Sequence, residues 1–396
     1  MSDTFQITGG GPLKGEITIS GAKNAASKMM VASLLTDQLV VLSNVPRQHE
    51  TEITQEIITT VGAQIEWIDE HTLKIETPEV SSNSVRELSR KNRISILTLA
   101  PLLHRAGEAF VPLVGGDKIG PRPVNFHLET LKKMGAQIDE TPDGYHAHVE
   151  GRLQGALIEL PYPSVGATET AILAGVLAEG RTTILNAAGE PEVKGLVMML
   201  QNMGAIIQIN TGRHIEIIGV EKLGGAEARV MPDRIEVATL MIAAAVTKGD
   251  VTVQGVVPDH IEPLIRKLKE AGAEVNISAN GIRVAGNGTL QSVDIETLPF
   301  PGFPTDMQAQ FMSLLTIASG VGVVTETIFE NRFMHANELM RMGANIRVEQ
   351  RQAIVQGVPK LLGAEVKITD LRAGAALIIA GLMAEGQTSV YGLDHL

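Results

Sequence analysis

The 396-residue sequence predicts an α/β (α+β) protein of two domains, each built from three helix–strand–helix–strand units. Three observations lead to this prediction. The length exceeds what one hydrophobic core usually supports, a Gly-Ala pair that ends a helix-like stretch recurs about every seventy residues, and a helix-length run of small apolar residues lies between successive pairs. Gly-Ala pairs are common by chance, but five copies with matching flanks favour a true repeat.

Each Gly-Ala pair predicts the end of one helix and the start of one strand. A glycine after an apolar-periodic run takes the left-handed conformation of a helix C-cap, and the alternating residues that follow indicate a half-buried strand. The copies are IITTVGAQIEW, LETLKKMGAQID, MMLQNMGAIIQI, LIRKLKEAGAEVNI and LMRMGANIRV, with Gly62, Gly135, Gly204, Gly272 and Gly343.

The second helix of the repeat is apolar nearly all round, which predicts burial at a domain centre. Six such helices begin near Lys23, Arg93, Gly166, Arg234, Thr305 and Arg372. A sixth Gly-Ala pair would fall roughly at position 413, beyond Leu396. We therefore expect a truncated sixth unit without its second helix and closing strand, either because the chain is a piece or because the protein does without them.

Composition narrows the class of function. Without any cysteine, disulfides, thiolate metal sites and a cysteine nucleophile are excluded. A net charge of −12 and only 3% aromatic residues argue against nucleic acid as a partner. The opening MSDTFQITGG has no signal pattern and no apolar run reaches membrane length, so we expect a cytoplasmic protein without membrane association.

Charged residues recur where the buried helices begin. A helix N-terminus exposes unpaired N–H groups and suits an anion, so equivalent starts pointing at one interdomain cleft would form an anion site. A single arginine is more often a solvated surface charge, but the repeated placement reverses that interpretation for the set. The cationic and amide members are Lys23, Asn24, Arg93 and Arg372, joined by Arg122 in GPRPVN and Arg332 in ENRFMH.

Asp306 in FPTDMQ is an acid where its counterparts are basic. Aspartate is a good N-cap, which is one interpretation. A carboxylate among cationic neighbours would also stay ionised and accept a proton from a hydroxyl. The two interpretations remain open at this point.

The stretch LVGGDKIGPRPVNFH combines a flexible, glycine-rich part with a rigid part in which an arginine lies between two prolines. Its glycines allow the backbone to fold over a ligand, whereas Pro121 and Pro123 fix φ on either side of Arg122. We interpret this stretch as a lid that excludes water. His127 at its end is interpreted as structural rather than as a ligand of a diphosphate.

The motifs SGAKNAA, GGDKIGPRPVNFH, SVGATET, MPDRIE, FPTDMQAQF, ETIFENRFMH and TDLRAGAAL together closely resemble the UDP-N-acetylglucosamine 1-carboxyvinyltransferases, which are enolpyruvyl transferases, over essentially the whole chain. The resemblance implies an inside-out α/β prism of two domains with three βαβαββ units each. Residues 1–22 and 231–396 would form the first, discontinuous domain with an incomplete last unit, and residues 23–230 the second, with the mobile lid at 113–123.

The resemblance also implies a reaction. The enolpyruvyl group of phosphoenolpyruvate would pass to the 3′-hydroxyl of UDP-N-acetylglucosamine with release of phosphate, the first committed step of peptidoglycan synthesis. No metal and no organic cofactor are expected. The partners would be these two small molecules, and a monomer is favoured.

Roles for individual residues follow from the same resemblance. Lys23 and Asn24 would contact phosphoenolpyruvate and the reacting sugar, and Asp306 would bind the sugar hydroxyl as general base. The catalytic set would be Asp117, Asp306 and Lys23. The substrate-binding set would be completed by Arg93, Arg122, Pro123, Val124, Asn125, Phe126, Ser164, Val165, Gly166, Ile328, Arg332 and Arg372.

The sequence departs from the family pattern at several places. Asp117 stands where most members have cysteine, and to act as a general acid it would need a pKa raised by about three units. Fosfomycin, which alkylates that cysteine, is therefore predicted not to inactivate this protein. Asn125, Tyr162 and the pair His49-Glu50 also differ, and the arginine of the family's last unit lies beyond Leu396. A weak or silent relative that binds UDP-sugar, and a transferase for another uridine nucleotide, remain the alternatives.

Overall fold

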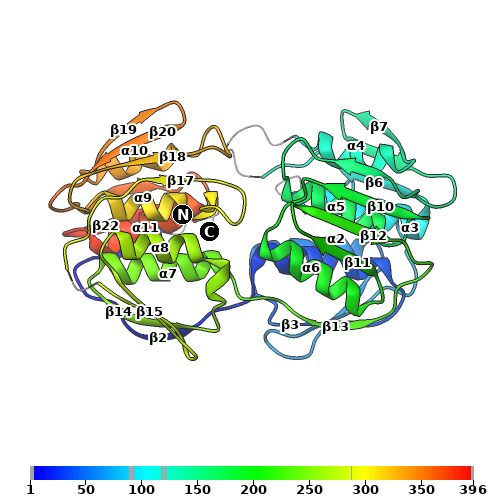
Figure 1. The fold of residues 1–396 in the computed structure, drawn as a ribbon, viewed down its shortest axis with the longest axis horizontal. Coiled ribbons are helices and arrows are strands. Elements are labelled where there is room, and N and C mark those ends of the chain that lie inside the picture. The colour runs from blue at the N-terminus through cyan, green and yellow to red at the C-terminus, as the bar shows by residue number, and fades with distance from the viewer. Residues whose placement is uncertain (1–3, 89–92, 117–118, 120–122, 287, 394–396) are drawn as a thin grey trace. The chain divides into compact units, whose positions relative to one another are not determined.

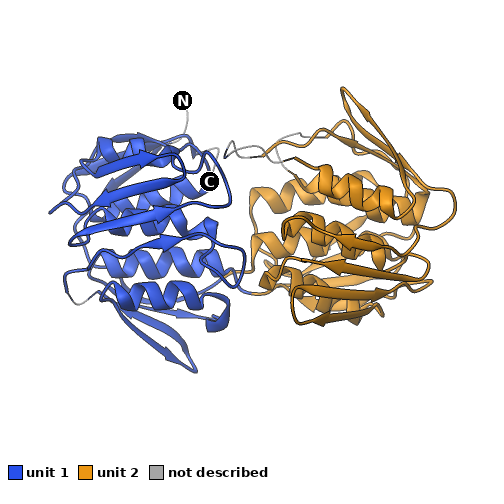
Figure 2. Ribbon diagram, turned by 45° about the horizontal axis from the view of Figure 1, so that its top comes forward, with its two compact units in different colours: residues 1–19, 117–121, 232–396 blue, residues 20–116, 122–231 orange. Residues whose placement is uncertain are grey.

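The computed structural model describes residues 4–88, 93–116, 119, 123–286 and 288–393. The chain divides into two compact units (Figure 2). Unit 1 comprises residues 1–19, 117–121 and 232–396, and unit 2 comprises residues 20–116 and 122–231. Each unit has its own hydrophobic core.

Unit 2 contains three repeats of the predicted kind. The first comprises α1 (Lys23–Ala32), η1 (Ser33–Leu35), β3 (Val40–Ser43), α2 (His49–Thr60), β4 (Gln64–Trp67) and β5 (Leu73–Glu76). The second comprises η2 (Ile94–Thr98), α3 (Leu99–Ala106), β6 (Glu108–Pro112), α4 (Asn125–Lys133), β7 (Gln137–Thr141) and β8 (Gly144–His148). The third comprises β9 (Leu157–Glu159), α5 (Val165–Gly175), β10 (Arg181–Leu185), α6 (Pro191–Asn202), β11 (Ile206–Asn210), β12 (His214–Ile218) and β13 (Ala226–Arg229).

Unit 1 follows the same plan. It begins with β1 (Thr4–Thr8) and β2 (Lys14–Thr18), then continues with α7 (Arg234–Val246), β14 (Asp250–Gln254), η3 (Pro258–His260), α8 (Glu262–Glu270), β15 (Glu274–Ser278) and β16 (Gly281–Ala285). Next come β17 (Ile295–Glu296), η4 (Thr305–Met307), α9 (Gln308–Leu315), β18 (Val321–Thr325), α10 (Met334–Arg341), β19 (Asn345–Glu349) and β20 (Gln352–Gln356). The last elements are β21 (Glu365–Lys367), α11 (Leu371–Met383) and β22 (Gln387–Tyr391).

The sheets share one connectivity. The strand after each buried helix pairs antiparallel with one neighbour, and outside the β6-β8-β7 sheet it also pairs parallel with an edge strand, as β10 does with β12 and β9. The strand orders are β13-β3-β5-β4, β6-β8-β7 and β11-β12-β10-β9 in unit 2, and β15-β16-β14-β2, β17-β18-β20-β19 and β1-β22-β21 in unit 1. In the last of these, β1 pairs antiparallel with β22, so the first strand of the chain completes a sheet begun near its end.

The Gly-Ala prediction is confirmed in all five copies. Each glycine has a positive φ, from 93° at Gly343 to 118° at Gly62. The following alanine donates its N–H to the carbonyl five residues earlier, for example Ala63 to Ile58 at 3.0 Å and Ala273 to Leu268 at 2.9 Å. This 6→1 hydrogen bond is the Schellman motif, which ends the helix and turns the chain into the next strand.

In each unit the most apolar helices lie inside the sheets (Figure 1). The interior helices are rich in alanine and glycine, so their backbones pack closely; α11, for example, buries Ala373, Gly374, Ala376 and Gly381. The predicted inside-out α/β prism is therefore confirmed. The predicted helix from Arg93 differs in detail, because it opens with the 3₁₀ turn η2. Pro101 in α3 has no N–H to donate to Leu97, which prevents a continuous α-helix there.

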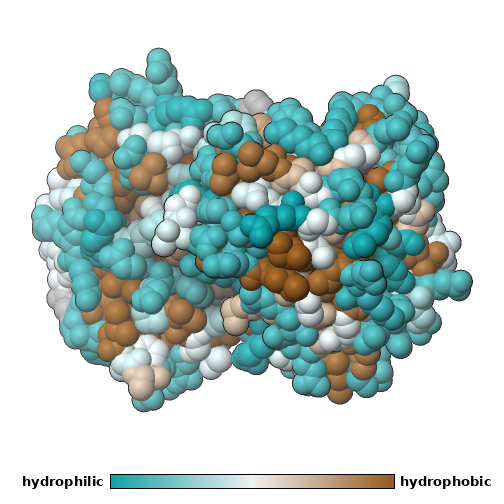
Figure 3. Space-filling model, turned by 45° about the vertical axis from the view of Figure 1, so that its right-hand side comes forward, coloured by the Kyte–Doolittle hydropathy of each residue, from teal (hydrophilic) through white to brown (hydrophobic). Residues whose placement is uncertain are grey.

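The surface carries several separate hydrophobic patches on the face seen in Figure 3. The most exposed large apolar side chains include Met198 at 64%, Leu157 at 60% and Ile206 at 55%. No helix within the described ranges is both long and apolar enough to cross a membrane.

Candidate active site

In unit 1 the structure brings three predicted residues into direct contact. Asp306 lies in η4, Arg332 lies in the loop before α10, and Arg372 lies in the first turn of α11. One carboxylate oxygen of Asp306 lies 2.8 Å from Nη2 of Arg332, and the other lies 2.9 Å from Nη2 of Arg372. The Arg332 side chain is only 4% exposed and that of Asp306 is 27% exposed, so the contact is shielded from solvent mainly on the side of Arg332.

The contact determines the charge state of Asp306. Burial alone would raise the pKa of this carboxyl, but the guanidiniums of Arg372 and Arg332 outweigh it and hold the pKa well below its usual range. Asp306 is therefore ionised, as one of the two sequence interpretations expected. It does not serve as a helix cap, since Pro304 precedes η4 and Met307 precedes α9 at the cap positions.

The start of α11 is fixed by Asp370. Its carboxylate accepts hydrogen bonds from the backbone N–H groups of Arg372 at 3.0 Å and Ala373 at 3.1 Å. An aspartate at this position satisfies two N–H groups that would otherwise have no partner in the helix. The cap thereby sets the position from which Arg372 reaches Asp306.

In unit 2, Lys23 at the start of α1 pairs with Glu50 of α2. Nζ of Lys23 lies 3.0 Å from Oε2 of Glu50, and Nζ of Lys28 lies 3.9 Å from Oε1. The hydroxyl of Ser27 donates to the same Oε1 at 2.9 Å. Burial raises the pKa of Glu50. The charges of Lys28 and Lys23, with hydrogen bonds from Lys23 and Ser27, outweigh this effect and hold the pKa below its ordinary value. Asn24 is half-buried in the same helix turn.

The remaining predicted residues of unit 2 gather around the N-termini of α4 and α5. Nη2 of Arg93 donates to the carbonyl of Pro123 at 3.5 Å, just before Val124, Asn125 and Phe126. Ser164 is the N-cap of α5, and its hydroxyl accepts from the N–H of Ala167, after Val165 and Gly166. The helices α4 and α5 pack against each other.

His127 links these two helices from a buried position. Its Nδ1 lies 2.7 Å from the hydroxyl of Thr170, and a Cβ on Gly166 would lie 2.8 Å from its Cε1. A side chain at position 166 would clash with this imidazole, which explains why the residue is a glycine. Burial lowers the pKa of His127 to about 3, with a further contribution from the charge of Arg93, so the ring is neutral. Its contacts fit the structural interpretation.

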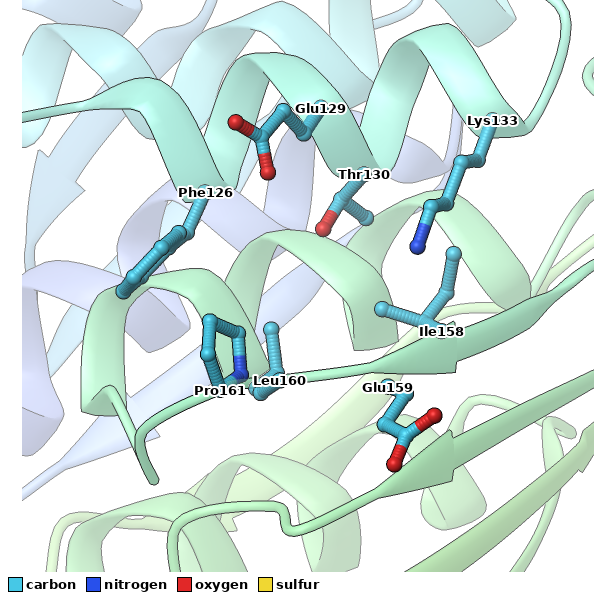
Figure 4. A pocket seen from close by; sticks show the side chains of 8 residues that line it. All are labelled: Phe126, Glu129, Thr130, Lys133, Ile158, Glu159, Leu160 and Pro161. Carbon is cyan, nitrogen blue, oxygen red and sulfur yellow. The ribbon is translucent and has the colours of Figure 1, made fainter.

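A shallow pocket lies beside this cluster (Figure 4). Phe126, Glu129, Thr130 and Lys133 of α4 line one wall, and residues 158–161 line the other. Phe126 is the only predicted site residue in this lining, so the pocket borders the predicted nucleotide-binding residues rather than containing them.

Two predicted residues, Asp117 and Arg122, lie outside the described residues. Within the predicted lid, Ile119 is described; its side chain is 3% exposed and its carbonyl accepts the N–H of Asn331 at 3.0 Å. In the described part of the chain, no group of three or more His, Asp or Glu side chains is arranged to hold a metal ion.

Comparison with known proteins identifies the family to which this chain belongs. Residues 7–396 match the family model for EPSP synthase (3-phosphoshikimate 1-carboxyvinyltransferase). The chain is 50% identical to UDP-N-acetylglucosamine 1-carboxyvinyltransferase of Gluconobacter oxydans over 100% of this chain and 94% of that protein. It is 48% identical to UDP-N-acetylglucosamine 1-carboxyvinyltransferase 2 of Carboxydothermus hydrogenoformans, with the same coverage.

The chain belongs to the UDP-N-acetylglucosamine 1-carboxyvinyltransferase family. Solved structures agree with this assignment. The enolpyruvyl transferase NikO from Streptomyces tendae superposes with a TM-score of 0.88 at 25% identity, covering 100% of this chain and 94% of that one. An EPSP synthase from Acinetobacter baumannii has a TM-score of 0.77 at 21% identity, covering 99% of this chain and 94% of that one, and so supports the enolpyruvyl transferase fold alone.

Sequence reasoning missed several residues that support the site in this family member. Glu50 had been noted only as a departure from the family pattern, and its pairing with Lys23 could not be foreseen, because 27 residues separate them. Thr305, which contacts Arg332, and Glu326, which contacts Thr305, lie in the motifs FPTDMQAQF and ETIFENRFMH but were not singled out within them. A carboxylate placed directly after a strand, next to a conspicuous ENRF motif, is the pattern that could have drawn attention to Glu326.

Proposed function

We propose that this chain transfers the enolpyruvyl group of phosphoenolpyruvate to the 3′-hydroxyl of UDP-N-acetylglucosamine and releases phosphate. The observation that carries the proposal is Asp306, an ionised carboxylate held between Arg332 and Arg372, in a chain about half identical to enzymes named for this reaction. The activity would be the committed step of peptidoglycan synthesis, and with it of cell wall biogenesis, cell shape and cell division.

The first step adds the sugar hydroxyl to phosphoenolpyruvate. The oxygen forms a bond to C2, the hydroxyl proton passes to the carboxylate of Asp306, and a proton is added to C3, giving a tetrahedral intermediate. In the second step the C2–O bond to phosphate breaks, and a proton leaves C3. Charge on the phosphate is stabilised by the cationic residues, for which preorganised guanidiniums are well suited.

The two arginines also regulate how basic Asp306 is. In the arrangement described here they keep its pKa low, which makes the carboxylate a weak base. A substrate phosphate would compete for the same guanidiniums and so release part of their hold on Asp306. Its pKa would then rise towards the range that general-base catalysis needs.

Further roles are proposed for residues of unit 2. Lys23, Asn24 and Arg93 would bind the substrate anions, while Val124 to Phe126 and Ser164 to Gly166 would hold the uridine diphosphate, together with Ile328 of unit 1. Asp117, on a lid at 113–123, would donate the proton to C3. We place the activity in the cytoplasm, where phosphoenolpyruvate is produced, and favour a monomer.

Phosphate release tests the proposal. Release from phosphoenolpyruvate should require UDP-N-acetylglucosamine and should fall about 10²- to 10⁴-fold in Asp306→Asn, which removes the proposed base. A matched control is Asp294→Asn, an exposed acid of the same unit whose carboxylate accepts the N–H of Val323. Phosphate release that is independent of the sugar nucleotide, or none at all from the wild type, would contradict the proposed function.

A further inference from the structure

A buried carboxylate is linked through one hydroxyl, that of Thr305, to the group formed by Asp306, Arg332 and Arg372. Glu326, which follows β18, is 0% exposed and is not a residue that the proposed chemistry uses. Its Oε1 accepts hydrogen bonds from the hydroxyl of Thr297 at 2.9 Å, and from the N–H groups of Ile328 at 2.9 Å and Phe329 at 3.2 Å. Its Oε2 accepts from the hydroxyl of Thr305 at 2.8 Å.

These four donors come from three separate segments of unit 1. Thr297 follows β17, Thr305 begins η4, and residues 328–329 begin the loop that leads to Arg332. Further hydrogen bonds join the same segments, since Thr327 donates its N–H to the hydroxyl of Thr297 at 2.9 Å. Glu326 thus fixes the relative position of the segments that carry Asp306, Ile328 and Arg332.

A carboxylate suits this position because all four partners donate hydrogen bonds to it. A carboxylate accepts at both oxygens, whereas a glutamine would turn an NH₂ group towards either the two N–H groups or the Thr305 hydroxyl, and the hydroxyl would then have to accept instead of donate. A buried polar atom left facing another donor loses its hydrogen bond without compensation from water. The residue type is therefore explained by its contacts.

Thr305 extends this arrangement to the proposed reaction site. Its hydroxyl donates to Glu326 and accepts from Nη1 of Arg332 at 3.0 Å, while Nη2 of Arg332 lies 2.8 Å from Asp306. The hydroxyl has a single proton, and that proton points to Glu326, so its lone pair faces the guanidinium. Both terminal nitrogens of the Arg332 guanidinium therefore have a partner, Asp306 for Nη2 and Thr305 for Nη1.

We propose that Glu326 and Thr305 are positioning residues, which orient the guanidinium of Arg332, and through it Asp306, for proton transfer from the sugar hydroxyl. This inference rests on the proposed function. Neither residue touches the reacting atoms in it. The carboxylate of Glu326 orders the hydroxyl of Thr305, the hydroxyl orders Arg332, and small errors in the position of Asp306 slow the reaction.

The test compares steady-state phosphate release in Thr305→Val, Thr305→Ser and the wild type. Valine keeps the shape of threonine and lacks the hydroxyl, whereas serine keeps the hydroxyl. We expect Thr305→Val to lower kcat roughly 10- to 100-fold, as for loss of a hydrogen bond to a charged group, with KM for UDP-N-acetylglucosamine changed by less than about threefold. Thr305→Ser should restore kcat to within about threefold of the wild type.

A matched control separates positioning from a general loss of packing. Thr388 in β22 of the same unit is 0% exposed, and its hydroxyl has no hydrogen-bond partner within the described part of the chain. Thr388→Val should therefore leave kcat unchanged. Glu326→Gln, if it folds, should lower kcat at least as much as Thr305→Val.

The outcomes are distinguishable. If the wild type is active and Thr305→Val has the kcat of Thr388→Val, the positioning role is wrong although the proposed function stands. The role is also wrong if Thr305→Ser is as slow as Thr305→Val, because the hydroxyl would then not be the feature that matters. A wild type that releases no phosphate with UDP-N-acetylglucosamine overturns the proposed function and this inference with it.

Discussion

Replacing Glu50 with glutamine should destabilise unit 2 far more than the loss of an exposed ion pair would. The carboxylate of Glu50 is 20% exposed and lies between Lys23, 23% exposed, and Lys28, 14% exposed. Exposed pairs contribute about 0.2–1 kcal/mol, whereas removing one partner of a fully buried pair costs about 3–5 kcal/mol. With two cations left close together and mostly shielded, we expect a loss of about 2–3 kcal/mol in the free energy of unfolding.

Urea unfolding followed by tryptophan fluorescence measures this loss. Trp67 is the only tryptophan, and its Nε1 donates to Gln55 in α2, the helix that carries Glu50. Its signal therefore reports the unfolding of the region concerned. The control is Glu66→Gln, whose pair with Lys74 has a 71% exposed carboxylate, and for which we expect at most about 0.5 kcal/mol.

The pH dependence gives a second check on the same variant. Because the pKa of folded Glu50 lies below its ordinary value of 4.5, its contribution is present above that pH and is lost as the pH falls through the folded pKa. The difference between wild type and Glu50→Gln should thus be complete at neutral pH and shrink in acid. The reasoning is refuted if Glu50→Gln costs no more than Glu66→Gln at neutral pH.

Three further outcomes are expected. Burial raises the pKa of Glu169 to about 8, so the stability that its protonation gives is complete below pH 4.5 and is lost as the pH rises to 8. In urea unfolding, Glu169→Gln should therefore lose less stability than the wild type between these pH values, and equal losses in the two proteins would contradict this. Gly166→Ala should cost about 1–3 kcal/mol of stability because its Cβ meets His127, and a double-mutant cycle with His127→Ala should recover part of the cost, whereas purely additive effects would argue against the contact. Fosfomycin should neither inactivate the wild type nor add mass to it, while Asp117→Cys should become sensitive; an adduct on Asp117 would overturn the prediction.

The repeat could be predicted from the sequence because its signals are local. A glycine cap, the helix before it and the strand after it lie within a dozen residues, so Gly62 and Gly272 indicate their own conformations. The surroundings of Asp306 could not be predicted in the same way. Its partner Arg372 is 66 residues away, and a sequence does not say in which direction either side chain points. The repeated helix starts and the family resemblance had placed them near the same anion, but neither predicted their direct contact.

The same limit explains why the supporting residues were missed. The role of Glu326 depends on four donors from three segments, and no periodicity in the sequence indicates that these segments meet. Glu50 was identified as unusual because it differs from the family pattern, yet its function as the partner of Lys23 depends on how α1 packs against α2. Buried polar networks of this kind are specified by tertiary structure.

The two clusters share one electrostatic arrangement. In unit 1 a single carboxylate lies between Arg332 and Arg372, and in unit 2 a single carboxylate lies between Lys23 and Lys28. Each carboxylate offsets the repulsion between two cationic side chains and fixes their positions, but its single negative charge neutralises only one of the two positive charges. Counted alone, each triad of side chains carries one net positive charge, in a chain whose net charge is −12. Cations that are held in place before any ligand arrives suit the recognition of a polyanion, since they avoid the cost of ordering flexible side chains at the moment of binding.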